Sequence, residues 1–411
     1  MKKIAFIFSQ FPCYDETFIL REMNQLRASG LSFRIYSIKR CRDKIVHDDA
    51  KELIGVTNYL PLFSLKLILI NFYFLLRHPV RYISIFFSIC SENIKSRNFF
   101  LKSIGLFPQM VGFTWQARRD KIGHVHGQWA TYPATYAYVI SRLNSIPFSF
   151  TGHAHDIYLD TTGLKEKMER AKFVVTCTED NKRYLLELFN NCKMSALSSQ
   201  LKDKIIVSYH GVDLNEFKTK SEKLKTETQN QKLKILSVGS LFECKGFDIL
   251  IEACKILKDE GINFECTIAG GGHLLEKLKQ LAISYHLSGK VIFTGYITQD
   301  KLIPLYEQAD VFALPVRLSI HWGIPNVVIE AMAAGLPVIT GNLPSIPEII
   351  QDGKTGFIIP EENPQALAGA FERLFKDVKI RKAVGSASYK AVAEQFDVAK
   401  NASRLKAVFE E

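Results

Sequence analysis

The sequence predicts an α/β protein with two domains, each built on a parallel sheet. The chain has 411 residues, 47% hydrophobic and 23% charged, which is a globular composition too long for one compact core. Beyond about residue 120, short apolar runs alternate with helical patterns in two series. This alternation is typical of βαβ units and of a sheet buried on both faces.

The first domain begins at the N-terminus. The apolar run Ile4 to Phe8 is shorter than the h-region of a signal peptide and ends at a polar turn, so we expect a buried strand there. Residues 218–234, KTKSEKLKTETQNQKLK, contain two leucines as their only apolar residues and end the first domain. We predict a first domain over 1–216, a second over 217–393, and a terminal helix over 394–411 that returns to the first domain.

The second series contains the apolar runs ILSVG, FECTIAGGG, KVIFTG and DVFALP, each followed by a helical pattern or an irregular loop. Ligands of open α/β sheets bind at the carboxyl ends of the strands. We therefore expect the substrates in a central cleft between the two domains. The AGGG turn, residues 269–272, is by itself a weak phosphate signal, and a tight turn into a helix explains it more simply.

The eight cysteines are scattered without a C-x-x-C pair. That pattern argues against a zinc knuckle and against a disulfide framework. It favours a reducing, cytoplasmic location.

Positive charge is concentrated in residues 61–119. This segment has eight Lys or Arg against one acid, Glu92, with twelve interleaved aromatic residues, while the whole chain has a net charge of +11. Three interpretations stay open: buried helices, a membrane-spanning helix, or an interfacial patch on an anionic membrane. A spanning helix is disfavoured because Lys66, Asn71 and Arg77-His78-Pro79 interrupt the apolar run before the roughly 20 residues a bilayer requires. We expect no nucleic-acid partner, since no recognition module accompanies the charge.

Histidines stand at the ends of two predicted strands. His124 and His126 form an H-x-H pair, and His153 follows the strand PFSFTG. H-x-H pairs also serve metal-dependent hydrolases. Further ligands are missing here, however, because Asp156 follows His155 directly and Tyr158 stands where a histidine is needed. We therefore expect no metal and no cofactor, and a structural role for His124 and His126 with one side chain inward and one outward.

Several blocks in order resemble a known family. They are HVHGQWATYPATYAYVI, IPFSFTGHAHDIY, VGSLFECKGFDILIEA, VIFTGYI, GIPNVVIEAMAAGLPVI and IPEIIQDGKTGFIIP. Together they are similar to the retaining family-4 (group 1) glycosyltransferases of the GT-B fold. The early stretch YDETFILREMNQL resembles the start of exopolysaccharide and colanic-acid-type members. The resemblance covers nearly the whole chain and implies two Rossmann-like domains and a nucleotide-diphosphate sugar donor.

The chemistry of such a transferase suggests a role for several residues in these blocks. A leaving diphosphate needs backbone N–H groups at a helix start and a cation. Pro325, Asn326 and Val327 are placed to begin such a helix, and Lys245 at a strand-to-helix turn supplies the point charge. Glu330 is a lone carboxylate on an apolar helix and needs a partner, for which ribose hydroxyls are suited.

The resemblance adds two further contacts. It implies that His153 contacts the donor sugar and assists its transfer. It also implies that the backbone near Tyr296 holds the base.

This chain departs from the family pattern at three places. Ser240 replaces the usual Arg after VG, Trp322 stands near the position of the first of two glutamates, and Pro344-Ser345 replace glycines. Arg317 is a candidate to restore the lost positive charge.

The departures leave two functions open. One is a retaining transferase acting on a lipid-linked or polysaccharide acceptor, located peripherally at the inner face of the cytoplasmic membrane. The other is a catalytically degenerate nucleotide-sugar-binding partner subunit.

Overall fold

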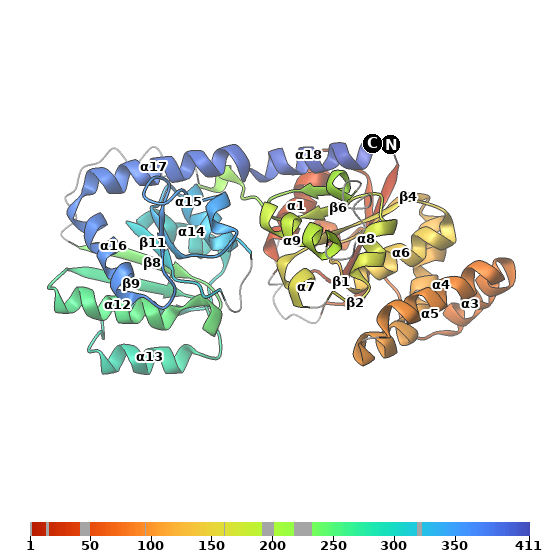
Figure 1. Cartoon of the computed structure of the whole chain (residues 1–411), viewed down its shortest axis with the longest axis horizontal. Helices are drawn as coiled ribbons and strands as arrows, with labels where there is room; N and C mark the ends of the chain where they lie inside the picture. The colour runs from red at the N-terminus through yellow and green to blue at the C-terminus, as the bar shows by residue number, and fades with distance from the viewer. Residues whose placement is uncertain are drawn as a thin grey trace. The chain divides into compact units, whose positions relative to one another are not determined.

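The structure is a computed structural model that describes residues 2–13, 16–41, 50–94, 96–159, 161–190, 201–217, 232–318 and 323–411. Its internal contacts divide the chain into two units. The first unit comprises residues 1–209 and 402–411, and the second comprises residues 210–401. Figure 1 labels the elements of both.

The first unit is built on a sheet of seven strands in the order β3-β2-β1-β4-β5-β6-β7, all paired in parallel. The strands are β1 (Lys3–Phe11), β2 (Phe33–Arg40), β3 (Thr57–Tyr59), β4 (Ile122–Gly127), β5 (Phe148–Gly152), β6 (Val174–Thr176) and β7 (Ile205–Val207). Side chains of β1 alternate between two cores: Ala5 and Ile7 enter one, and Ile4, Phe6 and Phe8 enter the other. The sheet is thus buried on both faces, as the sequence predicts.

Helices cover both faces of this sheet. They are α1 (Thr17–Ala28), α2 (Lys51–Ile54), α3 (Leu65–Arg77), α4 (Pro79–Asn93), α5 (Arg97–Arg119), α6 (Tyr132–Asn144), α7 (Ala154–Leu159), α8 (Leu164–Arg170) and α9 (Glu179–Asn190).

The second unit is built on six parallel strands in the order β10-β9-β8-β11-β12-β13. They are β8 (Leu233–Val238), β9 (Phe264–Ala269), β10 (Val291–Gly295), β11 (Val311–Leu314), β12 (Val338–Gly341) and β13 (Phe357–Ile359). Its helices are η2 (Leu214–Phe217), η3 (Glu243–Lys245), α12 (Phe247–Asp259), α13 (Leu275–Ser284), α14 (Gln299–Gln308), α15 (Asn326–Ala333), η4 (Ile346–Glu348), α16 (Pro364–Lys376) and α17 (Val378–Gln395).

The last helix, α18 (Val398–Glu410), ends on the first unit. Phe409 packs edge-on against Phe6 and His126, with ring centroids 5.5 Å and 5.2 Å apart. Lys406 Nζ donates a hydrogen bond of 2.6 Å to the carbonyl oxygen of Ser29. The C-terminal residues therefore complete one of the two cores beside the first sheet.

The basic aromatic segment forms three helices, α3, α4 and α5. Ser64 caps the start of α3 by accepting a hydrogen bond from Leu67 N, and α3 ends before Pro79, which begins α4. Asn71, one of the residues that interrupt the apolar run, ties the three helices together. Its Nδ2 donates to the carbonyl oxygen of Pro108 at 3.0 Å, and its Oδ1 accepts from Tyr82 Oη at 2.9 Å. Within the described residues, no helix is both long and apolar enough to cross a membrane.

Candidate functional site

A glycine-bounded turn follows β8 and carries Lys245. Gly246 has φ +68°, and a Cβ there would lie 2.0 Å from the carbonyl oxygen of Pro315, so only glycine fits. The Lys245 stem lies over Gly239, because a Cβ on that glycine would be 3.9 Å from Lys245 Cγ and Cδ. Burial lowers the pKa of the Lys245 ammonium. This ammonium makes no ion pair or hydrogen bond with the described residues, which leaves it available to an anion.

The segment that follows β11 leads toward α15 and passes the Lys245 turn. Backbone links join the turn to the segment leading toward α15: Arg317 N donates to the carbonyl oxygen of Cys244 at 3.0 Å. Pro325, with φ −65° and ψ 129°, caps α15 without a side-chain hydrogen bond. The first amides of a helix have no intrahelical acceptor and carry its positive dipole end. The amides of Asn326 and Val327 are such groups.

Glu330 is buried in the second turn of α15 and is 4% exposed. One partner is Tyr306 of α14, whose hydroxyl donates to Glu330 Oε2 at 3.1 Å. Tyr306 is fully buried and was not predicted as a site residue. The sequence signal was weak, because a tyrosine on the apolar stripe of a helix looks like an ordinary core residue.

The loops after β9 and β10 lie next to each other. A Cβ on Gly271 would lie 3.7 Å from Cβ of Tyr296, the residue that follows β10. Gly270 and Gly272 allow backbone contact, since a Cβ on them would lie 1.9 Å from Gly239 O and 2.6 Å from Leu241 O. The glycines of this turn are therefore explained by packing. Ser240 is exposed beside them, and Trp322 lies outside the described residues.

Arg317 does not supply the missing cation. Its guanidinium binds Asp248 through both carboxylate oxygens, at 3.0 Å and 2.8 Å. It also pairs with Glu362 and donates to the carbonyl oxygen of Glu243 at 2.6 Å. Two carboxylates already neutralise it, so the suggestion that Arg317 restores the charge absent at Ser240 is wrong in this structure.

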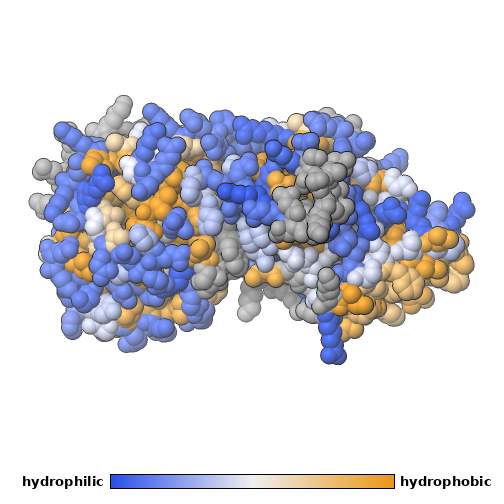
Figure 2. All heavy atoms as spheres, in the orientation of Figure 1, coloured by the Kyte–Doolittle hydropathy of each residue, from blue (hydrophilic) through white to orange (hydrophobic). Residues whose placement is uncertain are grey.

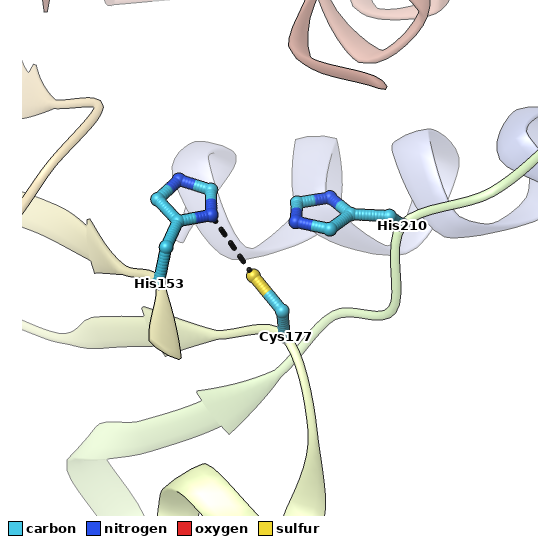
Figure 3. Close-up of side chains that lie close together, drawn as sticks. All are labelled: His153, Cys177 and His210. Carbon is cyan, nitrogen blue, oxygen red and sulfur yellow. Dashed lines mark hydrogen bonds between the residues drawn. The ribbon is translucent and has the colours of Figure 1, made fainter. Parts of the chain in front are cut away.

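In the first unit, His153 lies at the carboxyl end of β5 and is 5% exposed. Burial lowers its pKa to about 4, so the ring is neutral at pH 7. Its Nε2 lies 3.1 Å from the carbonyl oxygen of Gln128 and therefore carries the proton, while Nδ1 lies 3.4 Å from Cys177 Sγ. Figure 3 shows this last contact. Trp129 packs against the ring with centroids 4.2 Å apart. A neutral imidazole cannot serve as a general acid here.

Asp156 holds the loop that carries His153. One carboxylate oxygen accepts from His153 N at 2.7 Å, and the other accepts from Ala130 N. Lys167 Nζ donates to the carbonyl oxygen of Ala130 at 2.5 Å. Burial raises the pKa of Asp156 to about 7, although the backbone hydrogen bonds and the charge of Lys167 act to lower it. A second carboxyl group, Glu22 of α1, accepts from Gln128 Nε2 at 2.9 Å, and burial raises its pKa to about 7 as well.

We expect Asp156→Asn to lower the free energy of unfolding by about 1–3 kcal/mol, because the amide N–H₂ would face a backbone N–H. The folded-state pKa of Asp156 is raised, so its contribution is complete below about pH 4 and is lost as pH rises through about 7. The difference between the two proteins should therefore be larger at pH 5 than at pH 8. Thermal unfolding at both values checks this, with the exposed Asp203→Asn as control. An equal loss at both values would refute the assignment.

His124 and His126 are both buried in one core, which corrects the expectation of one inward and one outward side chain. Residues two apart on a strand face the same side. Ser149 Oγ lies 2.7 Å from a ring nitrogen of each, and Thr151 Oγ1 lies 2.9 Å from the other nitrogen of His126. Burial lowers the pKa of His124 to about 3. Both rings therefore have a structural role, packed and hydrogen-bonded inside the core.

The expectation that His153 binds no metal stays a prediction. A catalytic zinc needs three protein ligands. Two side chains of the first unit that could bind a metal lie close together here, with His153 Nδ1 3.4 Å from Cys177 Sγ. Burial also raises the pKa of the Cys177 thiol, which disfavours the thiolate that a metal requires. Figure 3 also labels His210, which is the first residue of the second unit.

Residues 218–391 match the family described as glycosyl transferases group 1. This part of the chain belongs to that family. The group 1 glycosyltransferase segment contains the Lys245 turn, Tyr296 and the start of α15.

Two curated relatives carry related names. The chain is 38% identical over 175 residues to the amylovoran biosynthesis glycosyltransferase AmsK of Erwinia amylovora, covering 42% of each chain. It is 36% identical over 169 residues to the putative colanic acid biosynthesis glycosyltransferase WcaL of Salmonella typhimurium, covering 40% of this chain and 41% of that one. The matched segment thus spans less than half the length of these relatives.

The fold has solved counterparts. The Anabaena Alr3699/HepE structure in complex with UDP covers 100% of both chains with a TM-score of 0.70 and 15% identity. The two Rossmann-like units, with parallel sheets throughout, are those of GT-B glycosyltransferases, which confirms the predicted fold class.

The residues predicted for the site fall into two groups in the structure. Loops after β8, β9 and β10 and the start of α15 carry Lys245, Ser240, Tyr296, Asn326, Val327 and Glu330 on the group 1 segment. His153 stands apart from them in sequence and belongs to the first unit. Its supporting residues Cys177 and Gln128 were missed, because only the folded sheet brings them to His153.

Proposed function

We propose that the chain is a retaining glycosyltransferase that moves a sugar from a nucleotide-diphosphate sugar to a lipid-linked or polysaccharide acceptor. One observation carries the proposal. The segment that matches the group 1 glycosyltransferases brings three kinds of group together in sequence: the Lys245 ammonium and the Asn326 and Val327 amides, which have no partner among the described residues, and the buried carboxylate of Glu330.

Each group in this arrangement suits a part of the donor. The amides at the start of α15 and the Lys245 ammonium neutralise the diphosphate as it leaves. Glu330 accepts hydrogen bonds from the ribose hydroxyls, and the backbone near Tyr296 holds the base. His153 contacts the transferred sugar as a neutral ring and does not transfer a proton. The UDP bound to the Anabaena relative supports a nucleotide donor.

The product of the proposed transfer is a cell-surface polysaccharide. The names of the amylovoran and colanic acid relatives support such a product. We propose that the protein acts in the cytoplasm, peripherally at the inner face of the cytoplasmic membrane, where lipid-linked acceptors are available.

Retention is tested by the product's anomeric configuration. The purified chain is incubated with its nucleotide sugar and acceptor, and the new linkage is assigned from the anomeric proton coupling in nuclear magnetic resonance. We expect the configuration of the donor to be preserved. An inverted linkage would contradict the retaining mechanism while leaving sugar transfer intact.

Ser240 and Trp322 favour a second candidate, a nucleotide-sugar-binding subunit without transfer activity. An indole cannot accept hydrogen bonds from sugar hydroxyls, but it can stack on the less polar face of a pyranose. In an active enzyme, Trp322→Glu should therefore cost about 0.5–1.5 kcal/mol of transition-state binding with the natural donor, roughly two- to tenfold in kcat/KM. If His321 or a neighbouring loop residue contacts the sugar instead, Trp322→Glu would change neither turnover nor donor preference. In a degenerate subunit, Trp322→Glu with Ser240→Arg should leave activity at zero or restore it.

A further inference from the structure

Large hydrophobic side chains gather on the outer surface of α3, α4 and the start of α5. Of the 21 exposed large hydrophobic residues among those described, fourteen lie between residues 62 and 104. Figure 2 shows them as an orange region over the α3, α4 and α5 helices of Figure 1. We call this region the α3–α4 apolar surface. It comprises Leu62, Phe63, Leu65, Ile68, Leu69, Phe72, Tyr73, Leu76, Val80, Ile83, Phe87, Ile94, Leu101 and Ile104.

The helix α3 is apolar on two faces. Leu67, Ile70 and Phe74 point into the core. Leu69, Phe72 and Leu76 are spaced along the opposite face and are 61%, 57% and 66% exposed. One apolar face suffices to pack a helix on a soluble domain. The second face is uncovered by any described part of the chain, and it needs a partner.

The charged side chains exposed around this surface are all positive. Lys66, Arg77, Arg81, Arg97 and Lys102 are exposed, and Lys66 and Arg77 flank the outer stripe of α3. The one acid of the segment, Glu92, is turned away and pairs with Arg170 of α8. A patch that is apolar at its centre and basic at its rim matches an anionic lipid surface.

Other occupants fit less well. A second copy of the chain would bring the same basic rim against itself, which costs electrostatic energy. Nucleic acid would leave the apolar side chains exposed. Because no described helix can cross a bilayer, the fit is to its interface.

We propose that α3 and α4 lie in the interface of an anionic membrane, with the α3–α4 apolar surface at the acyl boundary and the basic side chains at the phosphates. This membrane attachment does not depend on the donor or the acceptor. The attachment can therefore be disproved while the transferase assignment stands, and the transferase assignment can be disproved while the attachment stands. Its consequence for the proposed function is that a lipid-linked acceptor is presented to a protein already bound at its surface.

Vesicle flotation of the full chain tests the proposal. Vesicles of phosphatidylcholine with phosphatidylglycerol are compared with phosphatidylcholine alone. We expect binding to the anionic vesicles, partly released by high salt, because screening weakens the charge contribution but not the apolar one. A triple variant, Leu69→Ser with Phe72→Ser and Leu76→Ser, should reduce partitioning about tenfold or more. The control, Ile283→Ser with Ile292→Ser, removes exposed apolar residues of the second unit and should bind as the wild type does.

Two further variants keep the test decisive if the triple variant folds poorly. Lys66→Glu with Arg77→Glu should abolish the preference for anionic vesicles and the salt effect. Phe72→Trp should show blue-shifted fluorescence that brominated lipid quenches, whereas Ile292→Trp should not respond. Wild-type chain that fails to float, or a folded triple variant that floats equally well, would overturn the proposal. So would a wild-type dimer in light scattering that the triple variant dissociates.

Discussion

Replacing Lys245 by alanine should weaken the binding of a nucleoside diphosphate by about 1.5–3 kcal/mol, roughly 10- to 150-fold in Kd, which is the worth of a hydrogen bond to a charged group. The ammonium has no partner among the described residues, and burial lowers its pKa, so a bound diphosphate would supply the opposite charge it lacks. The affinity should be measured by calorimetry.

A matched control separates this effect from a general loss of positive charge. Lys255 of α12 is exposed and pairs with Asp259, so Lys255→Ala should bind the nucleotide as the wild type does. The nucleoside without phosphates should bind equally to the wild type and to Lys245→Ala. If Lys245→Ala weakens nucleoside and diphosphate by the same factor, Lys245 does not contact the phosphates.

Replacing Glu330 by alanine should also raise the Kd for the donor nucleotide by about 1.5–3 kcal/mol, because ribose hydroxyls would lose a charged acceptor. The loss should depend on those hydroxyls. The wild type should bind a 2′,3′-dideoxynucleotide more weakly than the normal nucleotide. Glu330→Ala should bind the two nucleotides with the same affinity. Calorimetry with both nucleotides measures the coupling.

Tyr306→Phe is the control for the structural part of this effect. It removes the hydroxyl that donates to Glu330 Oε2 and keeps the carboxylate. We expect a smaller loss of affinity than for Glu330→Ala, and the preference for the normal ribose should be preserved. A Glu330→Ala protein that still discriminates against the dideoxynucleotide would assign the ribose to another residue.

Much of the fold follows from local pattern. The run from Ile4 to Phe8 is buried as predicted, because uninterrupted apolar residues suit a strand covered on both faces. Glycine at 246 marks a turn with a positive φ that few other residues adopt, and proline at 325 marks the start of a helix, so these loops of the second unit could be placed from sequence.

The contacts between distant residues could not be placed in this way. Tyr306 and Glu330 are 24 positions apart, and Asp156 meets Ala130 only when β4 and β5 pair. Arg317 looked like a free cation because its partners, Asp248 and Glu362, lie far away in sequence.

Residues 61–119 were ambiguous for another reason. Apolar side chains on both faces of α3 predict burial as readily as they predict exposure to lipid, and only the folded unit distinguishes the covered face from the open one.

Transfer of labelled sugar tests the assignment most directly. The full chain is incubated in membrane extract with a panel of radiolabelled nucleotide-diphosphate sugars, beside the Lys245→Ala and Glu330→Ala proteins. We predict that label from one donor enters a lipid-linked or polymeric product, and that both variants lose most of this incorporation. If no donor yields product while the wild type still binds nucleotide, the chain is a binding subunit and the transferase assignment is wrong.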